Sequence, residues 1–170
     1  MQTNTQSRGQ GEQGARRSNS PTDAADSCAY VTLILADQLC GVPVLAVRDV
    51  LAGQTIARIP LAPPEVAGNL NLRGRIVTAI DLRQRLHLSP RPANAKPMSV
   101  VTELGSELYA LLVDQVREVV SLPAADMERN PPTLPPIWAE HSVGIYRVSD
   151  RLMVVLDVEK LLKLETVLAA

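Results

Sequence analysis

Short hydrophobic runs rich in Val, Ile and Leu recur along the chain from about residue 30, and polar turn residues separate them. Runs of this length and composition are typical of β-strands. We expect strands at residues 30–35, 39–44, 75–80, 99–102, 108–113, 116–121, 143–148 and 152–156. Pro43 has no amide hydrogen to donate, so it should lie at a sheet edge or at a bulge. The pattern indicates a mainly β protein.

Signals for helices are few in this sequence. A short helical turn is expected at residues 64–67, ended by Gly68, and another after Asp81. The longer candidate is residues 158–168, where Asp157 stands at the position of an N-cap. We therefore expect short helical turns and one C-terminal helix.

The first 27 residues differ from the rest in composition. They contain no Val, Ile, Leu, Phe, Tyr or Trp, so they cannot bury enough surface to offset the entropy lost on ordering. We expect a disordered tail over residues 1–27 and a folded domain over residues 28–170. No apolar run is long enough to span a bilayer, which predicts a cytoplasmic protein without direct membrane insertion.

The chain resembles itself in two places. A phrase of three valines with an Arg–acid pair occurs at residues 44–50 and again at residues 113–119. Further along, Gly68 precedes Asp81 by the same number of residues as Gly144 precedes Asp157. We interpret these matches as two small β units of related plan, although short apolar patterns also recur by chance. The boundary between the units is expected near residues 90–100, with exchange of strands between them left open.

Many short strands without regular alternation of strand and helix favour small barrels over a parallel α/β sheet. Each unit would be close to the lower size limit for independent folding, so the two should share an interface. Aromatic residues make up 2 % of the chain and Phe is absent, so the core must consist mainly of Val, Leu, Ile and Ala.

Charge and cysteine content exclude some classes of function. A net charge of −1 supplies no field to hold a phosphate backbone, so nucleic acid is not an expected partner. Cys28 and Cys40 lack metal-ligand spacing, and we expect two unpaired thiols.

No motif for catalysis or cofactor binding is present. The chain has no phosphate-binding loop, dinucleotide fingerprint, zinc-protease motif or nucleophile elbow. His87 and His141 lie far apart without ligands nearby, and we interpret them as solvated or capping residues. Two of Asp81, Asp114 and Asp157 would be needed for an acid/base pair, but helix capping accounts for Asp81 and Asp157. We expect no enzymatic activity, no cofactor and no metal.

One loop stands out as a candidate binding site. Gly68 and Gly74 permit backbone angles that other residues avoid, and Asn71 can bond to its own neighbouring backbone. Arg73 is thereby held on a short loop, where its planar donor fork can meet a carboxylate or carbonyl of a partner. A solvated turn arginine is the alternative interpretation.

The phrase Asn71-Leu72-Arg73-Gly74 and the residues after it, 76–77 and 80–83, resemble the signature of the CheW-like chemotaxis coupling proteins. Residues 41–44, 47–50 and 59–60 are similar to the first part of that family's sequence. Residues 113–122, 131–132, 144–145 and 156–162 are similar to its second part. The resemblance covers about residues 30–164.

The resemblance implies two SH3-like five-stranded β-barrels that share an interface, and a non-enzymatic scaffold without cofactor. It implies two partners: the regulatory domain of a CheA-type histidine kinase, and the cytoplasmic tip of the chemoreceptor coiled coil, which would bind in the groove between the barrels. The protein would thus be associated with membrane receptor arrays through its partners. An adaptor in a non-flagellar chemosensory pathway, for surface motility or gene regulation, is the alternative.

Carried over residue by residue, the resemblance places six residues in a receptor-facing groove and assigns Gly68 and Gly74 to a structural turn. The groove residues are Val44, Val47, Asp49, Asn71, Leu72 and Arg73. It does not identify the residues that bind the kinase. Pro43, the first strand without its usual aromatic residues, and the connector near Trp138 depart from the family pattern.

Overall fold

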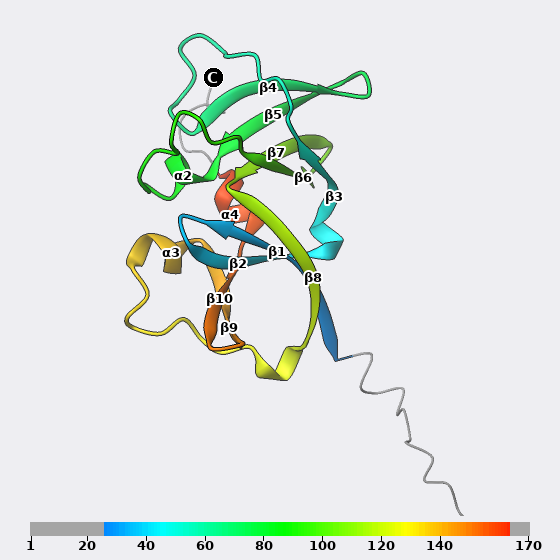
Figure 1. The fold of residues 1–170 in the computed structure, drawn as a ribbon. Helices are drawn as coiled ribbons and strands as arrows, with labels where there is room; N and C mark the ends of the chain where they lie inside the picture. Colours follow the sequence, from blue (N-terminus) through cyan, green and yellow to red (C-terminus); the bar gives the residue numbers. More distant parts are fainter. Residues whose placement is uncertain (1–25, 164–170) are drawn as a thin grey trace, which may run out of the picture.

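The computed structural model describes residues 26–163, which form two five-stranded β-sheets and a few short helices (Figure 1). The strands are β1 (Ser27–Leu35), β2 (Gln38–Pro43), β3 (Val47–Ala52), β4 (Val66–Leu72), β5 (Arg75–Asp81), β6 (Met98–Leu104), β7 (Glu107–Val113), β8 (Gln115–Pro123), β9 (Ser142–Val148) and β10 (Arg151–Leu156). The helices are η1 (Val44–Ala46), α2 (Leu82–Arg85), η2 (Ala124–Asp126), α3 (Pro136–Glu140) and α4 (Val158–Leu162). The expected mainly β class is confirmed.

The two sheets have the same plan. Sheet A has the strand order β8-β1-β2-β10-β9, and sheet B has the order β3-β6-β7-β5-β4. In each sheet the central pair, β2–β10 or β5–β7, is parallel and the other pairs are antiparallel. In Figure 1, sheet B lies above sheet A and α4 lies between them. The internal similarity of the sequence thus corresponds to two sheets of one design.

The sheets are joined by an exchange of hairpins. The chain consists of two five-strand repeats, β1–β5 and β6–β10, and the hairpin that opens each repeat pairs within the sheet of the other repeat. Sheet B is therefore one continuous stretch of chain, 47–113, whereas sheet A combines the strands before and after that stretch. A cut near residues 90–100 separates the two sequence repeats but not the two sheets.

Gly68 and Gly144, at equivalent positions of the two sheets, leave room for another segment of main chain to pass close to the strand. The main chain of Ala57 bridges to Asn69 in β4, and the main chain of Glu128 bridges to Ile145 in β9. A Cβ on Gly68 would lie 2.1 Å from the Ala57 carbonyl oxygen, and one on Gly144 would lie 2.7 Å from the Glu128 carbonyl oxygen. These bridges link the two outer strands of each sheet through the loops that follow β3 and β8.

A single large core joins the sheets. Leu33 and Cys40 from sheet A pack in the same buried cluster as Ile80 and Leu111 from sheet B, and Trp138 of α3 completes it. Both cysteines are free, as expected, and burial raises the pKa of the Cys40 thiol. Because this cluster takes residues from both sheets, separating the sheets would expose it to solvent.

Several element boundaries differ from the sequence-based expectation. The strand β1 begins at Ser27, which pairs with Pro123, so the last residue of the expected tail belongs to the fold and the first strand starts before residue 30. The helical turn expected at residues 64–67 is only a non-helical turn at Pro64 and Glu65, because Val66 already opens β4 and Gly68 lies inside that strand. Asp157 caps α4 as expected, but the helix ends at Leu162, short of the expected residue 168. Residues 164–168 and residues 1–25 of the expected tail lie outside the described residues.

Candidate partner-binding site

The tip of the β4–β5 hairpin has the tightly held geometry that the loop sequence indicates. Arg73 and Gly74 form the two-residue turn, both with positive φ, and Leu72 and Arg75 face each other on either side of it. The Asn71 side-chain oxygen accepts a hydrogen bond from the Gly74 amide at 2.9 Å. The turn is thus braced by its own sequence, and the Arg73 side chain is left 84 % exposed.

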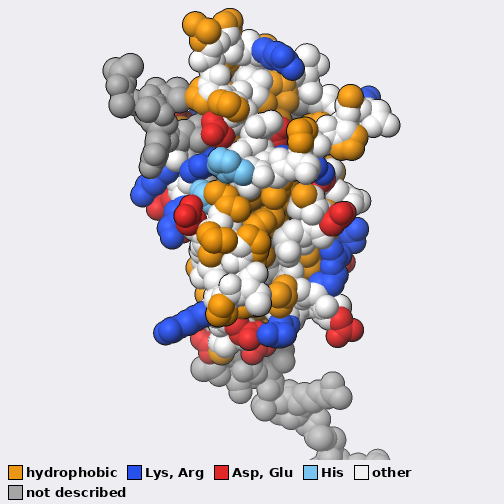
Figure 2. Space-filling model, turned by 90° about the vertical axis from the view of Figure 1, so that its left-hand side faces the viewer, with side chains coloured by type: hydrophobic (Ala, Val, Ile, Leu, Met, Phe, Trp, Pro, Cys, Tyr) orange, Lys and Arg blue, Asp and Glu red, His pale blue; other side chains and the backbone are white. Residues whose placement is uncertain are grey.

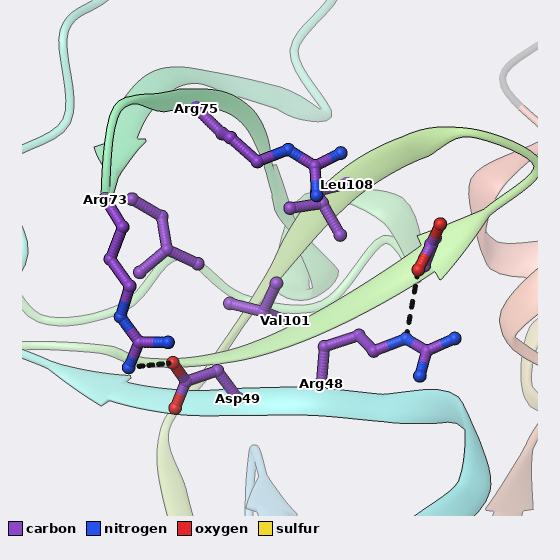
Figure 3. A pocket seen from close by; sticks show the side chains of 8 residues that line it. Arg48, Asp49, Arg73, Arg75, Val101 and Leu108 are labelled. Carbon is purple, nitrogen blue, oxygen red and sulfur yellow. Dashed lines mark ion pairs between the residues drawn. The ribbon is translucent and has the colours of Figure 1, made fainter.

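A pocket of about 190 Å³ lies beside this turn and is lined from all five strands of sheet B. Its rim carries two ion pairs, Arg73–Asp49 at 3.4 Å and Arg48–Glu103 at 3.0 Å (Figure 3). The lining residues are Arg48, Asp49, Leu72, Arg73, Arg75, Val101, Glu103 and Leu108. The outer strands β3 and β4 approach each other here, which lets Asp49 on β3 meet Arg73 after β4.

The structure divides the six expected groove residues into two groups. Asp49, Leu72 and Arg73 line the pocket, and the exposed Asn71 braces the turn beside it. Val44 and Val47 are half-buried where the chain passes from sheet A to sheet B, and neither lines the pocket.

The two expected turn glycines have different roles. Gly74 lies in the hairpin turn with a φ of 83° and open space around it. Gly68 is not a turn residue: it lies within β4, where the crossing Ala57 backbone leaves no room for a side chain. The sequence signal for Gly68 was its equivalence with Gly144, which faces a crossing backbone in the same way.

Sequence reasoning missed most of the pocket. Arg75 directly follows Gly74 in the chain and was visible as a further cation of the same loop. Glu103 and Leu108 face each other across the β6–β7 hairpin. They lie beside Arg73 only because β6 pairs with β3 and β7 pairs with β5, and no local sequence pattern predicts these long-range pairings. Val101 is fully buried and forms part of the pocket floor.

A second cluster of charges, centred on Asp114, connects the sheets. Arg83 after β5 donates to both Asp114 carboxylate oxygens, at 2.9 and 2.6 Å, and the Ala36 amide of the β1–β2 turn donates at 2.8 Å. Arg91 of the connector donates to Asp114 at 3.1 Å and lies 3.7 Å from Asp81. The cluster therefore ties sheet A, sheet B and the connector together.

The Asp114 cluster is partly shielded from solvent. The Arg83 and Asp114 side chains are only 14 % and 19 % exposed. Burial of Asp114 opposes its ionisation, but the hydrogen bonds from Arg83 and from the Ala36 amide outweigh burial, so the pKa of Asp114 lies below its usual value. The hydrogen bond to Asp114 raises the pKa of Arg83. Both groups stay ionised in the folded protein.

The aspartates considered as catalytic candidates, and His141, have structural partners. Asp81 and Asp157 accept hydrogen bonds from the amides of Arg83 and Lys160, which is the capping role expected for them. His141 is buried, with its Nδ1 atom 2.8 Å from a backbone carbonyl oxygen, and His87 is exposed at the end of α2. Within residues 26–163, no group of three or more His, Cys, Asp or Glu could hold a metal.

Comparisons with known proteins identify the family. The family model described as the CheW-like domain matches residues 29–166. The chain is 27 % identical over 135 residues to the chemotaxis protein CheW of Treponema pallidum, covering 77 % of this chain and 79 % of that protein. It is 27 % identical over 136 residues to the CheW of Klebsiella aerogenes, covering 80 % and 82 %.

A solved structure agrees with these relatives. The crystal structure of the scaffolding protein TtCheW from Thermoanaerobacter tengcongensis matches with a TM-score of 0.73 and 27 % identity, over 81 % of this chain and 94 % of that one. The fold and the relatives thus define a chemotaxis scaffold, and the chain belongs to the CheW-like family. It is a chemotaxis coupling adaptor and not an enzyme. Among the described residues, no helix is both long and apolar enough to cross a bilayer.

Proposed function

We propose that this adaptor couples a CheA-type histidine kinase to the cytoplasmic tip of chemoreceptors. The observation that carries the proposal is Arg73, which is mostly exposed on a turn braced by Asn71. A guanidinium held in this way binds a partner's carboxylate or carbonyl with little further loss of entropy. The names of the relatives given above refer to chemotaxis, which favours this role over surface motility or gene regulation.

The receptor-facing surface in this proposal extends from the pocket to the junction of the sheets. Asp49, Asn71 and Arg73 supply its polar part, and Leu72 supplies apolar surface beside them. Val44 and Val47 supply an apolar part at the junction, where the neighbouring Leu45 is 94 % exposed. An exposed apolar side chain next to an ordered polar rim is a common arrangement at binding surfaces.

The kinase would bind elsewhere on the adaptor. Figure 2 shows the side that carries α2 and α3, where hydrophobic side chains gather in a band across the middle of the face. In Figure 1 that side lies opposite β3 and the β4–β5 turn. An adaptor needs two separate surfaces to hold two partners at once, and this arrangement supports such a division. The adaptor would act in the cytoplasm and reach the membrane arrays through its receptor.

Binding measurements with purified proteins test the proposal. The full chain is titrated with a soluble receptor fragment that contains the signalling tip, with the kinase regulatory domain, and with each in the presence of the other. We expect both partners to bind and neither to displace the other. Failure to bind either partner, or competition between the two for one surface, would contradict the proposal.

A further inference from the structure

Arg75 is the unpaired cation of the pocket. It is the first residue of β5, it is exposed, and it lines the pocket beside Leu108 (Figure 3). Arg73 and Arg48 on the same rim are neutralised by Asp49 and Glu103. The Arg75 side chain has no hydrogen bond or ion pair with any of the described residues. Three arginines and two carboxylates leave the rim with one positive charge to spare.

The equivalent residue in sheet A behaves differently. Arg151 opens β10 as Arg75 opens β5, and it donates a hydrogen bond to the Asp37 carbonyl oxygen at 3.0 Å. Arg147, at the position equivalent to Asn71, forms an ion pair with Glu128 at 2.9 Å. The fold can therefore engage an arginine at this position in its own hairpins, but Arg75 is left available.

The pocket floor is apolar. Leu72, Val101 and Leu108 belong to the smaller hydrophobic cluster of sheet B, and the first and last are only half-buried. A volume of about 190 Å³ is smaller than the roughly 300–1,000 Å³ of typical small-molecule sites. The pocket is therefore of a size to receive side chains of a protein partner.

We propose that Arg75 and this apolar floor form a subsite for an acidic side chain of the receptor tip, with an aliphatic side chain one helical turn away. This inference rests on the proposed function, and it adds Arg75, Val101 and Leu108 to the expected groove. The Arg75 guanidinium receives the carboxylate as a two-donor fork, and Leu72 and Leu108 contact the aliphatic group. Residues three or four apart on a helix share a face, so a single helix presents both groups.

The rim charges select a carboxylate over a phosphate or a nucleic acid. Asp49 and Glu103 on the same rim offset two of its three arginines, so the rim has charge to balance one carboxylate but not a multiply charged anion. A single carboxylate is neutralised by Arg75 without displacing either ion pair. The two pairs also hold Arg48 and Arg73 in place around the pocket.

Titration of a soluble receptor-tip fragment with full-chain variants tests this subsite. We expect Arg75→Glu to weaken binding about tenfold or more, since it removes the donors and introduces repulsion. Arg75→Lys, which keeps the charge but not the fork, should retain part of the affinity. Arg151→Glu is the matched control, because it makes the same change at the equivalent position of the other hairpin; its effect should stay below about twofold.

A charge exchange identifies the partner group. Each acidic residue of the receptor fragment is replaced by lysine in turn, and one replacement should restore binding to Arg75→Glu while weakening binding to the wild type. Unchanged receptor affinity of Arg75→Glu, an equal loss with Arg151→Glu, or a loss confined to the kinase domain would overturn the subsite. Absence of receptor binding by the wild-type chain would contradict the proposed function itself.

Discussion

The hairpin tips of the two sheets have the same design and different uses. Each is a two-residue turn with positive φ, Arg73-Gly74 between β4 and β5 and Ser149-Asp150 between β9 and β10. In sheet A, Arg151 beside the turn is bound to the Asp37 carbonyl within the fold. In sheet B, the arginines at and beside the turn face the solvent. Duplicated sheets thus allow the arginine of one hairpin to bond within the fold, whereas in our proposal those of the other hairpin bind a partner.

The largest loss of stability is expected at Gly68 and Gly144, the two glycines that lie against a crossing backbone. Gly68→Ala places a methyl group 2.1 Å from the Ala57 carbonyl oxygen at a residue with a φ of 148°. Either the crossing backbone or β4 must move, so we expect a loss of about 3 kcal/mol or more in the free energy of unfolding. Urea denaturation measures this loss of unfolding free energy. Gly144→Ala, with a 2.7 Å approach, should cost less, and equal stability of Gly68→Ala and wild type would show that the bridge is dispensable.

The second largest loss of stability is expected at Asp114, whose arginine partners are shielded from solvent, and not at Asp49, whose partner Arg73 is exposed. Asp114→Asn leaves Arg83 and Arg91 without their carboxylate at 14 % and 11 % exposure, and we expect a loss of about 3 kcal/mol in unfolding free energy. Asp49→Asn removes the exposed pair with Arg73 and should cost less than about 1 kcal/mol. Similar losses in the two variants would remove the distinction between the two clusters.

The Asp114 cluster also predicts a dependence of stability on pH. The folded pKa of Asp114 lies below its unfolded value of about 3.9, so its contribution is present above that pH and is lost as the pH falls through the folded pKa. Wild type should therefore lose more stability than Asp114→Asn between about pH 5 and the acid range. Melting curves at several pH values measure the difference, and parallel curves would count against it.

The fourth prediction concerns binding rather than stability. Arg73→Glu should weaken binding of the receptor fragment about tenfold or more, because a charge-assisted contact becomes a repulsion. The melting temperature and kinase binding should hardly change, since Arg73 is 84 % exposed. Ser149→Glu, at the equivalent position of the other turn, is the control. If receptor binding falls only together with the melting temperature, Arg73 is a structural turn residue.

The smallest loss of stability is expected for substitution of Gly74 in the β4–β5 turn. Gly74→Ala meets no atom within 4 Å, so its cost comes from the φ of 83° alone, about 1 kcal/mol. Gly74→Asn should cost less, because asparagine adopts left-handed angles more readily, as Asp150 does at the equivalent position with a φ of 64°. Thermal unfolding compares the two, and a larger loss for Asn than for Ala would contradict this explanation.

The sequence was sufficient for the strands with dense apolar runs but not for those interrupted by polar residues. The strand β3 alternates half-buried and exposed positions, but two consecutive charged residues, Arg48 and Asp49, interrupt the alternation of apolar and polar residues that would predict a strand. The strand β4 contains Gly68, Asn69 and Asn71, which are poor strand formers, and only pairing with β5 makes it extended. The turn and Arg73 were visible because a tight turn is a local feature. The pocket was not, because its floor and carboxylates come from strands that meet only through long-range register.

The hairpin exchange imposes an order of assembly on a chain emerging from the ribosome. Sheet B is one continuous stretch, 47–113, and its strands can pair as soon as that stretch is released. The β1–β2 hairpin is made first, yet β8 and β10, the strands on either side of it in sheet A, are made last. During this interval both edges of the hairpin stay open to other chains. Newly made adaptor is therefore most prone to aggregation just before its synthesis ends.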